Sequence, residues 1–268
     1  MLWTRIKTAI VLLLIGLSVV YLSNWFYFSF IAIILLLATR EYHQIYKKGG
    51  YHPSLVIMLI SIFLLLLFRY LYDFKGSDIL IAFIFLGSMA FHTIQYERGR
   101  ESSAIDFALT LGAVLYFGWI GGYFISIMFL SSGQWWLLLT IAIIAFSDSG
   151  AYFVGRRFGK KKMAPITSPK KTWEGYFGGV IFGLIGGLLV ALLFNQFVEV
   201  INTTNGVILG LVLSVVTPLG DLGESMIKRQ FHIKDSSKLL PGHGGAMDRI
   251  DTWTWAVCIS YYLITWFF

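Results

Sequence analysis

The stretch WEGYFGGVIFGLIGGLLVALLF, residues 173–194, decides the fold class of this chain. It carries one charged residue, Glu174, and as a helix rising about 1.5 Å per residue it is long enough to cross the roughly 30 Å hydrocarbon layer of a bilayer. Similar runs recur along the whole chain. Only 13% of the 268 residues are charged and 57% are hydrophobic, whereas about a quarter of a soluble domain is charged. The sequence therefore predicts an all-α, polytopic integral membrane helical bundle.

The apolar runs predict about nine transmembrane helices. The run at 104–131 is ambiguous, because the glycines in Gly118-Trp119-Ile120-Gly121-Gly122 would allow one long span or a hairpin. Charge favours a single crossing: except for Arg69 and Lys75, the lysines and arginines lie in clusters that can all face the cytoplasm only in that case. The clusters are at 5–7, 40–48, 98–100, 156–171 and 228–249. The predicted spans are 8–24, 25–39, 54–72, 79–95, 104–131, 135–153, 173–194, 205–222 and 251–268.

Composition also limits the function classes. The net charge of +7 is typical of membrane orientation and of contact with anionic lipid or phosphate, so we expect no nucleic-acid partner. The one cysteine, Cys258, excludes a disulfide framework and a cysteine-rich metal site. The first run resembles a signal peptide but lacks a small-residue cleavage pattern, so we predict a retained span.

The chain divides by chemistry near residue 134. We expect residues 1–134 to form transmembrane spans that serve as a packing and dimer scaffold, because they hold few unusual polar residues. Residues 135–268 hold most of the unusual polar residues and are predicted to form the catalytic region, with cytoplasmic loops at 154–172 and 223–250.

Asp148 lies inside an apolar run, about 20 Å from the start of its predicted span at ~1.5 Å per residue. A carboxylate at such depth costs roughly 2.5–3.5 kcal/mol on insertion scales. It is either a buried group hydrogen-bonded to a neighbouring helix or a ligand for a cation or substrate in a polar cavity.

Basic residues follow at 155–162 and 168–175. The first stretch could be a topology signal alone. In the second, Pro169 breaks the chain and Thr172 can cap the following helix, which would place Lys170 and Lys171 at its positive end as an anion site. Glu174 would be a dipole partner in the first turn or a partner for one of the lysines.

The segment Gly220–Arg229 carries acids followed by bases. Asp221, Glu224, Ser225 and Lys228 are spaced to lie on one face of a helix. Such a stripe fits a metal beside phosphates, or it is a salt-bridge ladder within the helix.

The stretch PGHGGAMDRID, residues 241–251, completes the polar region. Its glycines would let the backbone approach a phosphate closely, whereas His243 alone is a weak signal. Asp248 and Asp251 would face the same way on a helix, although Asp251 could simply be a capping or dipole residue.

Together these residues predict phosphoryl or nucleotidyl transfer. Oxygen ligands without cysteine suit Mg²⁺, which takes one or two carboxylates plus substrate phosphates, and the bases suit a polyphosphate. The chain has no Walker A motif. The candidate metal ligands are Asp148, Asp221, Asp248 and Asp251.

These segments resemble the phosphatidate cytidylyltransferase family, the CDP-diacylglycerol synthases. The resemblance covers 148–251, and the first 134 residues match only as apolar spans. Ala246 departs from the larger aliphatic residue usual in the family, which would loosen local packing. The family signature is similar to Ser225-x-Ile227-Lys228-Arg229-x4-Lys234-Asp235-x-Ser237-x2-Leu240-Pro241-x-His243-Gly244-Gly245-x2-Asp248-Arg249-Ile250-Asp251, and upstream to Asp148-Ser149-Gly150-Ala151-Tyr152, Gly155-Arg156, Ser168-Pro169-Lys170-Lys171-Thr172-x-Glu174-Gly175 and Gly220-Asp221.

The resemblance implies transfer of the cytidylyl group of CTP to phosphatidate. It further implies Mg²⁺ dependence, with room for a K⁺ ion, and a homodimer in a bacterial inner membrane with its site facing the cytoplasm. Asp221 and Asp248 look like the metal ligands, supported by Asp148 and Asp251. The expected catalytic residues are Asp221, Asp248, Lys228, Arg229 and Lys171. The expected substrate-binding residues are Lys170, Lys171, Ser225, Lys228, Arg229, Lys234, Asp235, His243, Gly244, Gly245 and Arg249.

Other classes stay open on the residues alone. A cation-coupled transporter would use the same acids, but no inverted repeat is visible and many bases and glycines accompany the acids. A scaffold protein would not need both the glycine-rich loop and the spaced acids. Among enzymes, a CTP-dependent lipid kinase of the polyprenol type is the nearest alternative, whereas the CDP-alcohol phosphotransferase pattern is absent.

Overall fold

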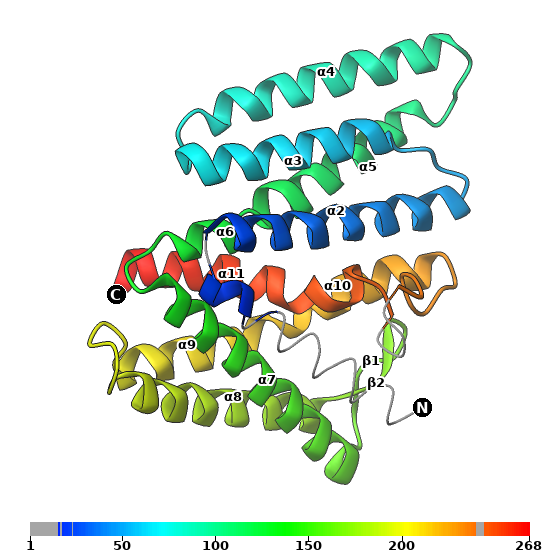
Figure 1. The fold of residues 1–268 in the computed structure, drawn as a ribbon. Coiled ribbons are helices and arrows are strands. Elements are labelled where there is room, and N and C mark those ends of the chain that lie inside the picture. Colours follow the sequence, from blue (N-terminus) through cyan, green and yellow to red (C-terminus); the bar gives the residue numbers. More distant parts are fainter. Residues whose placement is uncertain (1–15, 17, 23, 240–243) are drawn as a thin grey trace. The chain divides into compact units, whose positions relative to one another are not determined.

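The computed structural model describes residues 16, 18–22, 24–239 and 244–268 (Figure 1). Most of the predicted span 8–24, and Leu240–His243 of the predicted site, lie outside the described residues. The regular structure of the described part is helical apart from one hairpin. Its elements are α2 (Asn24–Lys48), α3 (Leu55–Tyr72), α4 (Ser77–Glu97), α5 (Ser103–Ala113), the π-helix η1 (Val114–Ile120), α6 (Tyr123–Met128), α7 (Gly133–Phe158), β1 (Lys162–Ala164), β2 (Ser168–Thr172), α8 (Trp173–Phe194), α9 (Thr203–Val216), α10 (Pro218–Gln230) and α11 (Met247–Phe267).

The described residues contain seven helices that are long and apolar enough to cross a membrane. The prediction of a helical membrane protein is confirmed, and the predicted count of nine is approximate. The last predicted span, 251–268, is the helix α11, which is rich in tryptophan, tyrosine and threonine and is not among these seven. The seven spans are Trp25–Lys48, Leu55–Tyr72, Ser77–Glu97, Ser103–Met128, Gly133–Phe158, Trp173–Phe194 and Thr203–Gln230.

The ambiguous run at 104–131 forms one candidate span, Ser103–Met128, as the charge pattern favours. Its middle winds as the π-helix η1, and the chain turns at Gly121 and Gly122 before α6. The glycines therefore mark an irregular stretch inside a single span and not the tip of a hairpin.

Several predicted boundaries differ from the structure. The basic cluster 40–48 continues α2, and α7 runs to Phe158, past the predicted span end at 153. The predicted loop 223–250 is helical at both ends, because α10 continues to Gln230 and α11 begins at Met247. Charged residues ended the predicted spans, but a helix can continue beyond the hydrocarbon layer, where its polar side chains are solvated.

The described chain falls into two compact units. The first comprises residues up to Ser126 together with Gln230–Arg249, and the second comprises Ile127–Arg229 with Ile250–Phe268. Segment Gln230–Arg249 thus belongs with the N-terminal helices. In the first unit, α3 packs against α2, α4 and η1, and α4 packs against α5 (Figure 1).

In the second unit, α8 packs against both α7 and α9 (Figure 1). Glycines along α8 permit this close approach. A Cβ atom on Gly183 would lie 2.6 Å from the Cβ of Ser214 in α9, and one on Gly187 would overlap the backbone of Gly206. Small residues that bring helix backbones together are the usual basis of helix packing in membranes.

Candidate active site

A cavity of about 430 Å³ lies in the second unit, among helices that are predicted to span the membrane. Two acids and two lysines singled out from the sequence line it. Its wall is formed by residues of α7, the hairpin, α8, α9, α10 and α11. They are Ser147, Asp148, Ala151, Tyr152, Gly155, Arg156, Met163, Lys170, Lys171, Thr172, Gly175, Tyr176, Gly179, Ser214, Pro218, Asp221 and Thr252.

Asp148 on α7 and Asp221 on α10 both face this cavity. Asp148 is an exposed residue in the described structure, so its carboxylate lines a cavity instead of being sealed among neighbouring helices. Its role as a ligand for a cation or substrate stays a prediction.

Lys171 forms an ion pair with Asp221, with 2.7 Å between Nζ and Oδ2. The two side chains are 27% and 37% exposed, so both groups remain accessible from the cavity. Lys171 Nζ also donates to the carbonyl of Pro218 at 3.4 Å. An accessible pair of opposite charges can exchange its partners for an anionic ligand and a cation.

The hairpin β1–β2 places the lysines. Its strands pair antiparallel, with Lys162 opposite Thr172, and β2 runs directly into α8. Thr172 Oγ1 accepts the N–H of Gly175 at 3.2 Å, which confirms Thr172 as the cap of α8. Lys170 and Lys171 therefore stand at the positive end of a long helix.

Two further contacts hold the hairpin. Glu174 accepts the backbone N–H groups of Lys160, at 3.0 Å, and Lys161, at 3.2 Å. These hydrogen-bond partners are thus backbone amides, and the place of Glu174 in the first turn of α8 agrees with the dipole alternative over the lysine one. Arg229 Nε on α10 donates to the carbonyl of Thr167, between the two strands, at 3.2 Å.

The predicted stripe on α10 is present. Ser225 Oγ donates to Asp221 Oδ1 at 3.1 Å, and Lys228 Nζ lies 2.8 Å from Glu224 Oε1. Glu224 and Lys228 are both buried. Glu224 and Lys228 thus form the salt bridge within the helix that the sequence allowed as an alternative. Asp221, nearer the N-terminus of α10, faces the cavity.

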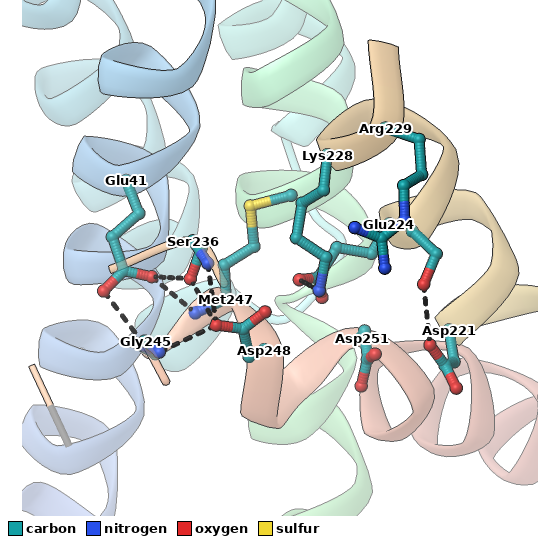
Figure 2. Close-up of polar contacts among 12 residues, drawn as sticks. Glu41, Asp221, Glu224, Lys228, Arg229, Ser236, Gly245, Met247, Asp248 and Asp251 are labelled. Carbon is teal, nitrogen blue, oxygen red and sulfur yellow. Dashed lines mark hydrogen bonds and ion pairs between the residues drawn. The ribbon is translucent and has the colours of Figure 1, made fainter. Parts of the chain in front are cut away.

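A second polar cluster lies in the first unit (Figure 2). Glu41 on α2 is only 5% exposed. Its carboxylate accepts hydrogen bonds from residues that precede Leu240 in the sequence and from residues that follow His243. The donors are Ser236 Oγ at 2.8 Å, Ser237 Oγ at 2.6 Å, Ala246 N at 3.0 Å and Met247 N at 2.9 Å.

Asp248, in the first turn of α11, joins the same cluster (Figure 2). Its Oδ2 accepts the N–H of Ser236 at 2.9 Å and the N–H of Gly245 at 2.8 Å, and it lies 2.8 Å from Ser236 Oγ. Asp248 thus accepts the backbone N–H of the residue three positions before it, which is the pattern of a capping box.

The glycine pair fits tightly against these acids. Gly244 has φ +82°, in the left-handed region that favours glycine, and a Cβ atom there would overlap Asp248 Oδ2. A Cβ on Gly245 would overlap Ser236 Oγ and Glu41 Oε2. The absence of a side chain at these glycines therefore leaves room for the carboxylates of Glu41 and Asp248, and the N–H of Gly245 donates to Asp248. Their contact with phosphate stays a prediction.

The other predicted site residues are placed as follows. Lys234, Asp235 and Arg249 are exposed in the first unit, and Asp251 Oδ1 accepts the N–H of Thr252 at 2.7 Å. His243 lies outside the described residues. The structure thus gathers Asp148, Lys170, Lys171 and Asp221 around one cavity of the second unit, and within the first unit it brings Gly245 and Asp248 together.

The donor set fits a hard cation only in part. Among the described residues, no group of three or more His, Cys, Asp or Glu side chains is arranged to hold a metal ion. A Mg²⁺ ion needs just one or two carboxylates when substrate phosphates and water complete its shell. Asp148 and Asp221, on the wall of one cavity, would be the carboxylates available to such an ion.

Sequence reasoning missed Glu41 and the role of Ser236. Glu41 sits within the basic cluster 40–48, and an acid among lysines and arginines at the end of an apolar run was a signal that could have been used. Its partners, however, could not be found by spacing, because they lie 195 to 206 residues further along the chain.

The fold and the cavity define a class: an integral membrane protein of packed helices with an acidic and basic site between its spans. The sequence model of the cytidylyltransferase family matches residues 3–267. The chain belongs to this family of nucleotidyltransferase enzymes, which confirms the resemblance drawn from the motifs.

Relatives of known name agree with this family assignment. The chain is 31% identical to the phosphatidate cytidylyltransferase of a Synechocystis strain, over 97% of this chain and 95% of that protein. It is 34% identical to the enzyme of the same name from Staphylococcus epidermidis, over 92% and 93% of the two chains. It is 48% identical to the Haemophilus influenzae protein of that name, over 47% of this chain and 44% of that one.

Proposed function

We propose that this protein transfers the cytidylyl group of CTP to phosphatidate, giving CDP-diacylglycerol and pyrophosphate. The names of the relatives support this reaction. The observation that carries the proposal is the cavity where Asp148 and Asp221 meet Lys170 and Lys171 among apolar helices. Such a site suits a lipid whose tails stay in the bilayer and a soluble, highly charged nucleotide.

The proposed chemistry is a direct in-line displacement. An oxygen of the phosphatidate phosphate attacks the α-phosphorus of CTP. The bond from that phosphorus to the bridging oxygen breaks, and pyrophosphate leaves with the electron pair. The attacking phosphate is already anionic, so the enzyme's main tasks are to position the two anions and to neutralise their charge.

Residues of the cavity divide these tasks. Lys170 and Lys171, at the N-terminus of α8, would hold phosphate oxygens. Asp148 and Asp221 would hold Mg²⁺, with Asp248 and Asp251 as the further predicted ligands. When bound, Mg²⁺ would supply positive charge against the triphosphate. Binding would replace the Lys171–Asp221 ion pair with a lysine–phosphate and a carboxylate–metal contact.

Lys228 and Arg229 have a less direct part in this proposal. Lys228 is paired with Glu224 in a buried position, and Arg229 contacts the hairpin that carries the lysines. Contact of either side chain with pyrophosphate would require these bonds to open. The same holds for the backbone N–H of Gly245, which would have to leave Asp248.

We place the enzyme in the bacterial cell membrane, as a homodimer, with the site open to the cytoplasm. The bacterial relatives support the membrane, and the clusters of lysine and arginine support the orientation. Chemical cross-linking in membranes tests the dimer, and labelling of single cysteines introduced at Lys160 and Gly76 tests the orientation.

The reaction is tested with purified protein in mixed micelles of detergent and phosphatidate, with labelled CTP, Mg²⁺ and varied K⁺. Appearance of both CDP-lipid and pyrophosphate supports the proposal. Asp221→Asn should lower the rate about 100-fold or more, whereas Asp78→Asn, at an exposed position on α4, should not. Release of CDP with a phosphorylated lipid alcohol would instead identify a kinase, and ion transport without nucleotide chemistry would identify a transporter.

A further inference from the structure

Glu41 has no part in the reaction as described, yet it is among the most heavily hydrogen-bonded carboxylates of the described residues. It is 5% exposed and accepts bonds from four donors. A buried carboxylate is unfavourable unless it is well hydrogen-bonded. Two of these donors, Ala246 and Met247, directly precede Asp248, and a third, Ser236, itself contacts Asp248.

We propose that Glu41 is a positioning residue that holds Asp248 in the orientation required to bind the nucleotide and its cation. The inference rests on the proposed function, because it takes Asp248 as a ligand in that reaction. It assigns to α2, a helix outside the motifs, an influence on Asp248 that acts through Ser236 and the backbone.

Two routes connect Glu41 to Asp248 (Figure 2). One is Ser236, whose Oγ lies 2.8 Å from both Glu41 Oε2 and Asp248 Oδ2. The other is the backbone: Glu41 accepts the N–H groups of Ala246 and Met247, which directly precede Asp248 at the start of α11. A displacement of the Glu41 carboxylate therefore moves both the side-chain and the main-chain support of Asp248.

The hydrogen-bond donors of this cluster suffice for the carboxylates of both Glu41 and Asp248. Glu41 receives Ser237 O–H and the N–H groups of Ala246 and Met247, while Asp248 receives the N–H groups of Ser236 and Gly245. The single proton of Ser236 Oγ can serve one carboxylate at a time. Glu41 thus also places negative charge at the N-terminus of α11, where a helix favours it.

Glutamine cannot replace Glu41 without loss. It has nearly the same volume, but its NH₂ group is a donor, and a backbone N–H facing it cannot accept a hydrogen bond. Since Ala246 and Met247 present backbone N–H groups to the two different carboxylate oxygens, either orientation of the amide breaks one of those bonds.

The first test compares Glu41→Gln with Glu97→Gln, a matched change at an exposed position on α4. Hydrogen exchange of the substrate-free protein should be faster across residues 244–249 in Glu41→Gln only. The Mg²⁺ concentration for half-maximal activity should rise about 10- to 100-fold, as for partners that orient a metal ligand. A residue with a purely structural role would lower the amount of folded enzyme and leave this concentration unchanged, which would overturn the proposal.

A second pair of variants tests the positioning role if Glu41→Gln does not fold. Ser236 contacts Glu41 and Asp248, whereas the hydrogen bond of Ser237 to a carboxylate goes to Glu41. Ser236→Ala should therefore raise the Mg²⁺ requirement more than Ser237→Ala does. Equal effects of the two changes would contradict positioning through Ser236.

The readouts separate this inference from the proposed function. If the wild type makes no CDP-lipid, the reaction is refuted, and hydrogen exchange still reports whether Glu41 holds the start of α11. If the wild type is active but Glu41→Gln changes neither exchange nor Mg²⁺ requirement, the positioning role is refuted and the reaction stands.

Discussion

Lys171 Nζ lies 2.7 Å from Asp221 Oδ2, on the wall of a cavity that both residues line. The pair joins β2, just before α8, to the first turn of α10. Because both side chains are partly exposed, the pair is available for exchange with ligands and contributes little to stability, about 0–1 kcal/mol.

Lys171→Met should therefore separate activity from stability. We expect cytidylyl transfer to fall about 100-fold, since a charge-assisted contact to phosphate is lost, while the midpoint of thermal unfolding changes little. Steady-state rates and melting curves in the same detergent measure both. Lys171→Arg, which keeps the charge, should recover part of the rate, and a large fall in melting temperature for Lys171→Met would show that the pair is structural.

Asp148→Asn should lower activity about 100-fold without destabilising the protein. The carboxylate lies in a candidate span and costs roughly 2.5–3.5 kcal/mol on insertion scales, so removing its charge should leave the fold as stable or more stable. Rates and thermal midpoints test this against Ser149→Ala, whose hydroxyl bonds to Ala145 O. If the Asp148→Asn enzyme is as active as the wild type, the carboxylate of Asp148 has no role in the reaction.

Gly245→Ala should disrupt the cluster around Glu41, because its Cβ would overlap Glu41 Oε2 and Ser236 Oγ. We expect a loss of about 1–3 kcal/mol in stability and a marked loss of activity. Gly87→Ala on α4 is the matched control, since a Cβ atom there has no neighbour within 4 Å. Melting curves and rates distinguish the two, and equal behaviour would argue against the tight fit at Gly245.

Gly183→Val should weaken the packing of α8 on α9. A Cβ on Gly183 would lie 2.6 Å from the Cβ of Ser214, a residue of the cavity wall, so the helices must separate. We expect lower thermal stability, by about 1–3 kcal/mol, together with lower activity. Gly87→Ala again serves as control. Unchanged melting would show that α8 and α9 can separate at little cost.

Local features of the structure were predictable from the sequence. The run 173–194 is the helix α8, because the thickness of the bilayer fixes the length of an apolar helix. Thr172 caps that helix, and Asp221 with Ser225, like Glu224 with Lys228, meet one turn apart on α10. These contacts depend on neighbours within a few residues, so the helical repeat determines them.

Helix ends were less predictable. α2 continues through the basic cluster to Lys48, and α10 through Lys228 to Gln230, because charge ends an apolar run but does not end a helix. The π-helix before Gly121 likewise has no reliable pattern in the sequence.

The sequence by itself thus determined the class of fold, the polar segments and the chemistry they suggest. Tertiary structure alone decided which of these residues meet. Lys171 on β2 pairs with Asp221 on α10, and Glu41 on α2 bonds to Ser236 across 195 residues, because the fold brings segments that are distant in the sequence together. Hydrophobic periodicity records which face of a helix is buried and not which partner covers it, so contacts between distant helices emerge only when the chain is folded.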